Sequence, residues 1–266
     1  MTNWNEIHRL ATTWVKEAGE RIKASFSEEL TIATKSHRND LVTDMDKGTE
    51  QFLIGKIHDH FPSHHILSEE GFGDDFADVG GIIWVIDPID GTMNFIHQQR
   101  NFAISIGVFH EGVGKVGMIY DVVHDEMYHT ISGEGAYMND TKLKPLTKGE
   151  VKDAIIGINA TWVTSNKRID PSYLAPLVKD ARGTRSYGSA ALEMAYVASG
   201  RLDAYISLRL APWDYGGGMI LINEVGGKTT NLKGEALMIT PQTSVFVARP
   251  GVHEEILQQY LNSGNW

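Results

Sequence analysis

Residues 82–95 read IIWVIDPIDGTMNF, an apolar run followed by an acidic, glycine-containing segment. The apolar, β-rich run Ile82–Ile86 predicts a short buried strand. Asp87-Pro88 predicts that the strand stops there and continues into a loop. This prediction places the Asp87 carboxylate at a strand end.

A tight turn is expected directly after this strand. Pro88 fixes the turn, so Asp87 and Asp90 could each face a different cation, as a two-metal site with ions about 3.5–4 Å apart requires. Asp90 in front of Gly91-Thr92 is typical of a helix N-cap. The backbone N–H groups of Gly91 and Thr92 would then be free to bind a phosphate oxygen.

Two further acidic motifs lie far away along the chain, SEEG at 68–71 and WDYGG at 213–217. Mg²⁺ prefers oxygen ligands and keeps several waters, so one or two carboxylates per ion from separate loops is the expected pattern. Taken singly, Glu69 and Glu70 would be a solvated pair and Asp214 the N-cap of a helix. The conjunction of the three motifs is what predicts a metal site.

The remaining sequence predicts helices and strands in mixed order. An amphipathic pattern from Trp4 to Ile22 predicts an opening helix, a second helix follows Asp46 and ends before Pro62, and the polar segment 34–44 between them is expected to be a loop. The other predicted elements are an antiparallel meander of strands at 102–109, 113–123 and 126–132, strands at 154–158, 202–206 and 244–248, and helices at 190–199, after Asp214 and at 252–261.

Composition indicates an ordinary globular protein. The 266 residues are 42% hydrophobic and 22% charged, which is enough to bury a sizeable core. We expect one continuous domain over residues 1–266, with room for two lobes at about 1–150 and 151–266. The absence of cysteine excludes disulfide frameworks, thiolate zinc sites, iron–sulfur clusters and cysteine nucleophiles, and it fits a reducing compartment.

Charge narrows the class of partner. A formal net charge of −10 argues against a nucleic-acid surface, since no basic stripe is present to neutralise phosphates. A small phosphorylated metabolite remains compatible, because carboxylates gathered around divalent cations form a locally positive site. The charged N-terminus lacks the apolar region of a signal peptide, and no apolar run approaches the roughly 20 residues of a membrane span. We expect a cytoplasmic protein with no nucleic-acid and no membrane partner.

At this point the motifs resemble a known family. WVIDPIDGTMNF at 84–95 and LAPWDYGGGMILINEVGG at 210–227 are similar to the two signatures of the inositol monophosphatases, which are Mg²⁺-dependent, lithium-sensitive phosphatases. The similarity extends from DLVTDMD at 40–46 to the last predicted helix. It implies an α+β fold, a layered αβαβα sandwich with mixed and antiparallel sheets, and a homodimer.

The same resemblance implies a set of metal ligands and catalytic groups. Two or three Mg²⁺ ions are expected: the first on Glu69, Asp87 and the Ile89 carbonyl, the second on Asp87, Asp90 and Asp214, and a weaker third reached from Asp46 through water. Glu69 and Thr92, with the metal ligand Asp87, would orient and deprotonate the attacking water, so that no nucleophilic side chain is needed. Li⁺ is expected to inhibit.

Substrate contacts follow from the resemblance as well. They are expected from Asp90, Gly91, Thr92, Gly188, Ser189, Ala190, Ser207 and Asp214. Gly188-Ser189-Ala190 would contact substrate hydroxyls, although the same residues suit an ordinary helix start. Ser207, seven positions before Asp214, departs from the family's pattern, which has a hydroxyl-binding Glu there in its animal members.

Several residues keep two interpretations. Asp44 and Asp46 could both cap the second helix, and only one need approach a metal. The histidines between His58 and His65 suggest zinc, but their spacing matches no standard site. Asn94 could line the site or serve turn chemistry.

The expected function is hydrolysis of inositol monophosphate to inositol and phosphate by a metal-activated water. The same fold and ligands also serve phosphatases of NADP, 3′-phosphonucleotides and fructose 1,6-bisphosphate, and they do not separate these substrates. A noncatalytic protein that binds metal or phosphate on this scaffold is the alternative from another class.

Overall fold

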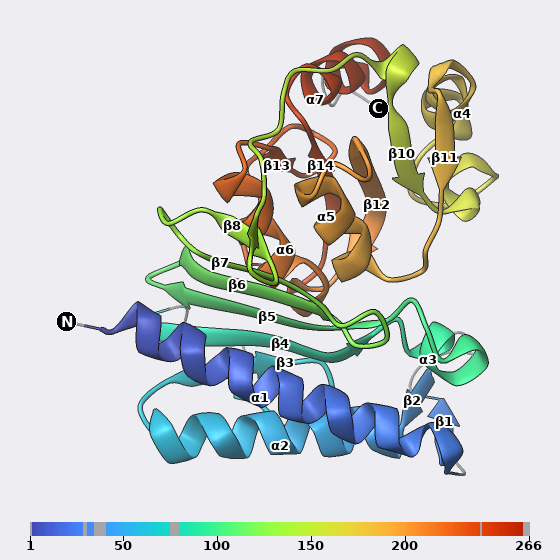
Figure 1. Cartoon of the computed structure of the whole chain (residues 1–266). Helices are drawn as coiled ribbons and strands as arrows, with labels where there is room; N and C mark the ends of the chain where they lie inside the picture. Colours follow the sequence, from blue (N-terminus) through green and yellow to red (C-terminus); the bar gives the residue numbers. More distant parts are fainter. Residues whose placement is uncertain (1, 29–30, 35–40, 75–79, 240, 263–266) are drawn as a thin grey trace.

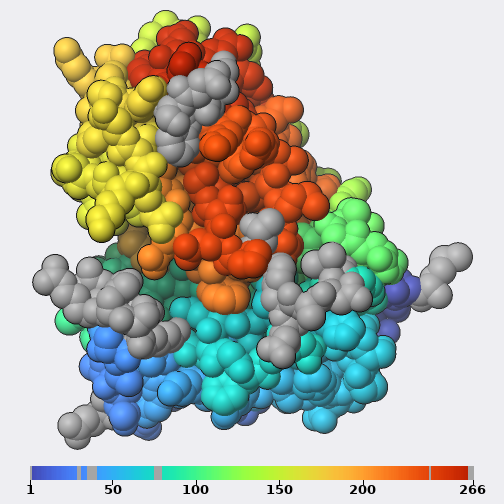
Figure 2. Space-filling model, turned by 180° about the vertical axis from the view of Figure 1, so that it is seen from behind, coloured from blue at the N-terminus to red at the C-terminus, as the bar shows by residue number. Residues whose placement is uncertain are grey.

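The structure is a computed structural model that describes residues 2–28, 31–34, 41–74, 80–239 and 241–262. Its layers run helix, sheet, helix, sheet, helix from bottom to top of Figure 1. This arrangement is the predicted αβαβα sandwich. The N-terminal half, up to about residue 150, supplies the lower helices and the larger sheet, and Figure 2 shows the C-terminal half, yellow to red, resting on it.

The helices are α1 (Trp4–Ala24), α2 (Asp44–His60), α3 (Thr92–Gln98), α4 (Pro171–Asp180), α5 (Ala190–Ala198), α6 (Pro212–Glu224) and α7 (Val252–Glu255), with short helices η1 (Ser25–Ser27), η2 (Val151–Asp153), η3 (Ala160–Val163) and the π-helical η4 (Ile256–Tyr260). The strands are β1 (Ile32–Thr34), β2 (Leu41–Thr43), β3 (His65–Ser68), β4 (Ile82–Asp90), β5 (Ala103–His110), β6 (Val113–Asp121), β7 (Glu126–Ile131), β8 (Ala136–Met138), β9 (Thr141–Lys142), β10 (Ile155–Ile158), β11 (Gly183–Arg185), β12 (Ala204–Leu210), β13 (Lys228–Thr230) and β14 (Thr243–Ala248).

The larger sheet has the order β3-β4-β5-β6-β7-β8-β9. Its first pair is parallel and the rest are antiparallel, which includes the predicted meander. Helices α1 and α2 cover one face, as Figure 1 shows, because their apolar stripes pack on Trp84, Ile86 and Ile104.

The middle layer is formed by α5 and α6, which are buried between the two sheets. Glycines let α6 approach the larger sheet closely. A Cβ on Gly217 would lie 2.8 Å from the Ile106 and Met118 carbonyl oxygens, and one on Gly218 would lie 2.8 Å from Met194 of α5. The glycines after Asp214 therefore set how close the start of α6 comes to β5 and β6.

The smaller sheet has the order β11-β10-β12-β14-β13, with β10, β11 and β12 parallel. Its strands alternate, since Tyr205 and Val247 face α5 and α6, whereas Ile206 and Phe246 face the outer helices α4 and α7. Both faces are covered, as expected for a sheet with parallel strands.

Several boundaries differ from prediction. The first strand of the 82–95 stretch continues to Asp90 instead of stopping at Asp87. The segment 34–44 is not simply a loop, because Leu41–Thr43 pairs with Ile32–Thr34; residues 35–40 lie outside the described residues. The helix expected after Asp46 begins at Asp44, and the one expected after Asp214 begins at Pro212.

Candidate active site

Three carboxylates from distant parts of the chain meet at the boundary between the two halves. Ligand oxygens of Asp87, Asp90 and Asp214 all lie within 4.8 Å of one another. The first two come from the end of β4 and the third from the first turn of α6. Asp87 and Asp90 are only 1% and 8% exposed, so their carboxylates have lost most of their solvation by water.

An irregularity in β4 orients the side chains of Asp87 and Asp90. The register between β4 and β5 shifts between Asp87 and Asp90, which accommodates Pro88, a residue without an N–H to donate. Asp87 Oδ1 accepts a hydrogen bond from Ile89 N at 3.0 Å. The strand thus turns within itself and presents both carboxylates at one end.

Asp90 does not cap the helix that follows it, contrary to the sequence prediction. That helix, α3, has Gly91 at its N-cap in the left-handed region with φ 98°, and no side chain caps it. Asp90 Oδ2 instead accepts from Ser189 Oγ and, at 2.7 Å, from Ala191 N. Asp90 therefore ties the N-terminal half to the start of α5.

Asp214 is not a helix N-cap either, although taken singly it would be predicted as one. It is the third residue of α6, and its Oδ2 accepts from Ala211 N at 2.8 Å. Ser105 Oγ donates to the Trp213 carbonyl at 3.4 Å, which fixes this turn against β5. The turn therefore holds Asp214 beside the β4 carboxylates.

The electrostatics of the cluster favour a cation. Burial raises the pKa of Asp87 well above its usual value, and the charges of Glu69, Asp90 and Asp214 raise it further. Burial raises the pKa of Asp90 to about 6 although bonds from Ser189 and Ala191 oppose this, and burial and Asp90 together raise the pKa of Asp214. Arg209 opposes the rise at Asp214, but the cluster remains acidic, and hard carboxylate oxygens gathered in this way fit a divalent cation such as Mg²⁺.

A second group of hydrogen bonds lies beside the triad. Thr92 Oγ is 2.9 Å from Asp46 Oδ1 and 3.1 Å from the Ile89 carbonyl oxygen, so its one proton goes to one of these acceptors at a time. Asp46 Oδ2 accepts from Thr43 N at 2.8 Å and from Thr43 Oγ. Thr43 is the N-cap of α2, and of the two aspartates considered for that role Asp46 is the one that reaches the site, while Asp44 Oδ1 accepts from Thr31 N.

Glu69 lies next to Asp87, since its charge and a hydrogen bond from one to the other raise the pKa of Asp87. The loop that carries Glu69 is held by Glu50, a residue that the sequence analysis missed. Glu50 is fully buried, its Oε1 accepts from Ser68 Oγ at 2.7 Å and Phe72 N at 3.0 Å, and its Oε2 accepts from Glu70 N at 2.7 Å. The sequence does contain a signal that could have identified Glu50. It is a carboxylate on the apolar face of a predicted helix, three positions before Leu53.

The triad opens into a cavity of about 230 Å³. Its lining includes Asp90, Asp214, Gly188, Ser189, Ala190 and Ser207, so six of the predicted substrate residues are brought together. Gly91 touches the same loop, because a Cβ there would lie 3.3 Å from the Gly188 carbonyl oxygen. Ser189 is also the N-cap of α5. The loop therefore lines the cavity and starts a helix, so both interpretations of it apply.

Glu193 is the second residue that sequence reasoning missed. It is 3% exposed, and its Oε1 accepts from Tyr187 N at 2.7 Å and Gly188 N at 3.3 Å. Asn94 Nδ2 donates to the Tyr187 carbonyl at 2.6 Å from the other side. The predicted substrate loop is therefore held from both halves of the chain.

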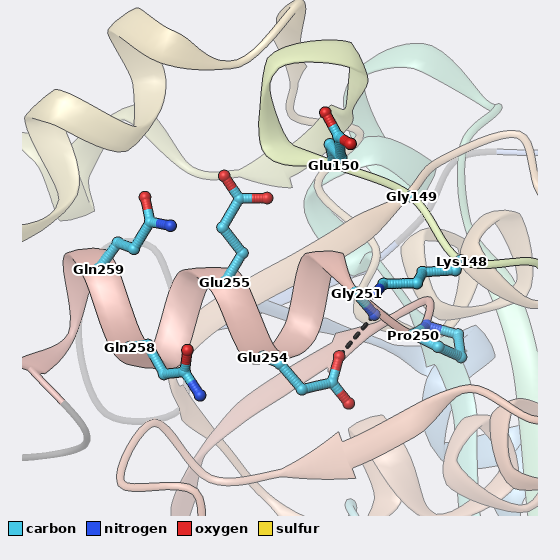
Figure 3. Close-up of a pocket in the computed structure, with 9 residues that line it drawn as sticks. All are labelled: Lys148, Gly149, Glu150, Pro250, Gly251, Glu254, Glu255, Gln258 and Gln259. Carbon is cyan, nitrogen blue, oxygen red and sulfur yellow. Dashed lines mark hydrogen bonds between the residues drawn. The ribbon is translucent and has the colours of Figure 1, made fainter.

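Other candidate features have structural partners. His64 Nδ1 accepts from Trp84 Nε1 at 2.9 Å, and His60 Nδ1 pairs with the Lys56 carbonyl. A larger hollow of about 590 Å³ lies at the start of α7 (Figure 3), but there Glu254 caps Gly251 N and Glu255 accepts from Val151 N. These carboxylates are satisfied by backbone, so we place the active site at the triad.

With this geometry established, comparison with known proteins identifies the family. A model of the inositol monophosphatase family matches residues 3–264. The chain belongs to the inositol monophosphatase family. It is 60% identical over 263 residues to the inositol-1-monophosphatase of Bacillus subtilis, covering 99% of both chains.

Solved structures of relatives superpose closely. SaIMPase-II with 2′-AMP bound matches with a TM-score of 0.88 and 42% identity, over 97% of this chain and 95% of that one. An IMPase/NADP phosphatase complexed with Mg²⁺ and phosphate matches with a TM-score of 0.90 and 29% identity, over 99% and 98%. The chain is thus a phosphoric monoester hydrolase of the inositol monophosphatase type. Within the part of the chain that the structure describes, no helix is both long and apolar enough to cross a membrane.

Proposed function

We propose that the chain hydrolyses inositol monophosphates with Mg²⁺. The observation that carries this is the cluster of the buried Asp87 and Asp90 with the half-buried Asp214, beside a cavity lined by the 188–190 loop. The proposed ligands are Asp87, Asp90 and Asp214 for one ion, Glu69, Asp87 and the Ile89 carbonyl for another, and Asp46 through water for a weaker third. Magnesium held there would neutralise phosphate charge and lower the pKa of a water.

The chain's own residues would position that water. Thr92 donates its proton to Asp46 or to the Ile89 carbonyl, so its oxygen keeps lone pairs with which to accept a hydrogen bond from water. Glu69, half-buried beside Asp87, is the group proposed to take the water's proton at its carboxylate. The N–H groups of Gly91 and Thr92 precede the first closed turn of α3, where such groups have no intrahelical acceptor, and they are proposed to bind phosphate oxygens.

Ser207 favours a second candidate function within the family, in which the enzyme accepts a wider range of leaving groups. It is 5% exposed, lines the cavity and carries no charge. Among the relatives, one is described as an NADP phosphatase and another holds 2′-AMP. NADP and 3′-phosphonucleotides are accordingly proposed as competitive substrates, and fructose 1,6-bisphosphate is the other to be tried.

Three further expectations accompany this proposal as predictions, the first two from the family and the third from composition. Li⁺ should compete at the more weakly held metal position, because a carboxylate cage that accepts one small hard cation should accept another. The chain should form a homodimer. It should act in a reducing compartment, consistent with the lack of cysteine.

Release of phosphate from a panel of substrates, with and without Mg²⁺, tests the proposal. The panel contains inositol 1-phosphate, NADP, a 3′-phosphonucleotide and fructose 1,6-bisphosphate. Mg²⁺-dependent release from inositol 1-phosphate is the expected result. Binding of the same compounds without any release would instead support a noncatalytic phosphate-binding protein.

A further inference from the structure

The predicted substrate loop, residues 188–190, leads from the end of β11 into α5 and has little room to move. Gly188 has a φ of 76°, and a Cβ on it would lie 3.0 Å from Asn94 Nδ2. A Cβ on Gly91 would lie 3.3 Å from the Gly188 carbonyl oxygen, so the loop touches the N-terminal half at two points. A small rotation of the loop would therefore change where Gly188 and Ser189 lie in the cavity.

Tyr187 is the residue through which this loop is anchored. Its N–H donates to Glu193 Oε1 at 2.7 Å, and its carbonyl accepts from Asn94 Nδ2 at 2.6 Å. Gly188 N shares the same Glu193 oxygen at 3.3 Å, so it adds no separate anchor point. Two anchors leave the loop free to rotate about the line that joins them. A third contact away from that line fixes the loop, and the Tyr187 side chain supplies one.

The third contact lies between two tyrosine rings. The Tyr187 ring meets the Tyr196 ring edge-on, with centroids 4.9 Å apart and an interplanar angle of 78°. Tyr196 lies near the end of α5 and is 8% exposed, and Tyr187 packs on the same apolar cluster. Edge-to-face ring pairs contribute about 2- to 10-fold to an equilibrium constant beyond the effect of the area that they bury. The orientation of Tyr187 therefore depends on where the Tyr196 ring lies.

Arg201, just after α5, contacts the Tyr196 ring. Its Cζ lies 5.5 Å from the centroid of that ring, and its backbone N–H donates to the Tyr196 carbonyl at 2.8 Å. Its two Nη atoms donate to the two carboxylate oxygens of Glu126 at the start of β7. Nη1 also donates to Tyr128 Oη at 2.6 Å, and Tyr128 Oη donates to Glu126 Oε2 at 2.6 Å. The larger sheet thus holds the guanidinium against α5.

The Glu126–Arg201 pair differs from an ordinary surface ion pair. The side chains of Arg201 and Glu126 are 43% and 23% exposed, and exposed ion pairs usually contribute little to stability. Here the pair is bidentate and shares Glu126 with the fully buried Tyr128, which limits the positions that the guanidinium can adopt. Its expected role is therefore to orient Tyr196 and not to stabilise the fold.

We propose that Tyr187 is a positioning residue for the substrate loop, and that the Glu126–Arg201 pair acts on it through the tyrosine rings. This inference rests on the proposed phosphatase function. Tyr187 is not among the residues that line the cavity, so its side chain acts on the reaction only through the position of residues 188–190. Loss of its ring weakens the binding of substrate and leaves the chemical step at the metals nearly unchanged.

Steady-state kinetics with inositol 1-phosphate at saturating Mg²⁺ test Tyr187. We expect Tyr187→Ala to raise KM about 3- to 10-fold while kcat changes less than about 2-fold. Tyr187→Phe keeps the ring and should behave as the wild type. Tyr187→Leu keeps apolar bulk without the edge-to-face contact, so it gives the same test if the alanine variant does not fold.

A matched variant and an inhibitor separate positioning from general damage. Tyr173→Ala removes a half-buried tyrosine of the same half, which packs on the apolar cluster beside α4 and does not line the cavity, and it should leave KM unchanged. The inhibition constant of inorganic phosphate should stay the same in Tyr187→Ala, because phosphate would bind at the metals and not at residues 188–190.

A double-mutant cycle tests the path from Arg201. Arg201→Gln should raise KM about 2- to 5-fold in the wild type and have no further effect in Tyr187→Ala, because the ring through which it acts is gone. Arg21→Gln is the matched control. Arg21 also pairs with a glutamate, Glu17, and its Cζ lies 3.9 Å from the centroid of the Phe52 ring, but it is on α1, so its loss should leave KM unchanged.

Four results would overturn the proposal. They are an unchanged KM in Tyr187→Ala and Tyr187→Leu, an equal rise in Tyr187→Phe, a fall in kcat without a rise in KM, and an effect of Arg201→Gln that adds in full to that of Tyr187→Ala. A wild-type enzyme that releases no phosphate from inositol 1-phosphate would instead overturn the proposed function, and this inference with it.

Discussion

Two buried glutamates brace the active site from opposite halves, and they differ in how completely they are satisfied. Glu50 of α2 holds the Glu69 loop, and both its oxygens accept hydrogen bonds, from Ser68, Glu70 and Phe72. Glu193 of α5 holds the substrate loop through Oε1 alone. Within the described residues its buried Oε2 has no hydrogen-bond partner.

The surroundings of Glu193 explain the difference. A Cβ on Gly157 would lie 2.5 Å from Glu193 Oε2, so a glycine is what makes room for this oxygen. Burial raises the pKa of Glu193 to about 7, against the effect of the bonds from Tyr187 and Gly188. Glu50 is thus fully paired, whereas Glu193 is a carboxylate that can be neutral near physiological pH.

The largest effect is expected on the metal side, from Asp90→Asn. An amide cannot supply the charge that the cation needs, and its NH₂ group would meet the N–H donor of Ala191 if flipped. We expect a loss of kcat/KM for inositol 1-phosphate well beyond the roughly 10- to 100-fold typical of changes around a metal site. Near-normal turnover at saturating Mg²⁺ would contradict the assignment of Asp90 as a metal ligand.

Glu50→Gln should follow, because it breaks a brace and leaves the ligands themselves in place. The amide nitrogen cannot accept from the loop that carries Glu69, so one backbone or hydroxyl donor loses its partner. We expect kcat to fall by about 10- to 100-fold, with a higher Mg²⁺ concentration needed for half-maximal rate. Glu17→Gln on the exposed face of α1 is the control, and an equal effect there would remove the special role of Glu50.

On the substrate side, Ser207→Glu tests the part of the cavity wall that Ser207 forms. A carboxylate bonded to a hydroxyl is worth about 1.5–3 kcal/mol, so the variant should raise the preference for inositol 1-phosphate over NADP by at least about 10-fold. The ratio of the two kcat/KM values measures this. A variant no more selective than the wild type would contradict the assigned place of Ser207.

The smallest kinetic effect is expected from Glu193→Gln, which keeps an acceptor for the Tyr187 and Gly188 amides. KM should rise a few-fold while kcat changes little, since the loop shifts and the metal ligands stay.

Stability gives Glu193→Gln a second readout. The pKa of Glu193 is about 7 in the folded chain and 4.5 ordinarily. Between these two pH values the folded chain therefore keeps a proton on Glu193 that the unfolded chain has released. Wild-type stability should therefore fall between about pH 4.5 and 7, by up to about 3 kcal/mol, and the variant should lose less over that range. Urea unfolding of both proteins without metal measures the difference, and identical slopes would contradict it.

The sequence predicted which carboxylates come together far better than it predicted what holds them. Asp87, Asp90 and Asp214 sit in long motifs whose residue types limit the chemistry, so they could be assigned before any geometry was known. Asp90 was nevertheless given the wrong hydrogen-bond partner, because a local N-cap pattern cannot reveal that its acceptor bonds come from α5, a hundred residues away.

The bracing residues were missed for a similar reason. Glu50 and Glu193 belong to helices that were predicted at about the right place, but a single glutamate in a helix is usually solvated and carries no local signature. The continuation of β4 through Pro88 was also unpredictable, since a proline normally ends a strand unless a bulge accommodates it.

We propose above that carboxylates from both halves of the chain hold one divalent cation between them. Anomalous diffraction from crystals soaked in Mn²⁺, which takes the same oxygen ligands as Mg²⁺, tests it most directly. We expect a peak within about 2.5 Å of an oxygen of each of Asp87, Asp90 and Asp214. Peaks only elsewhere in an enzyme that is active with Mn²⁺, or a peak that touches the β4 aspartates and leaves Asp214 out of reach, would contradict it.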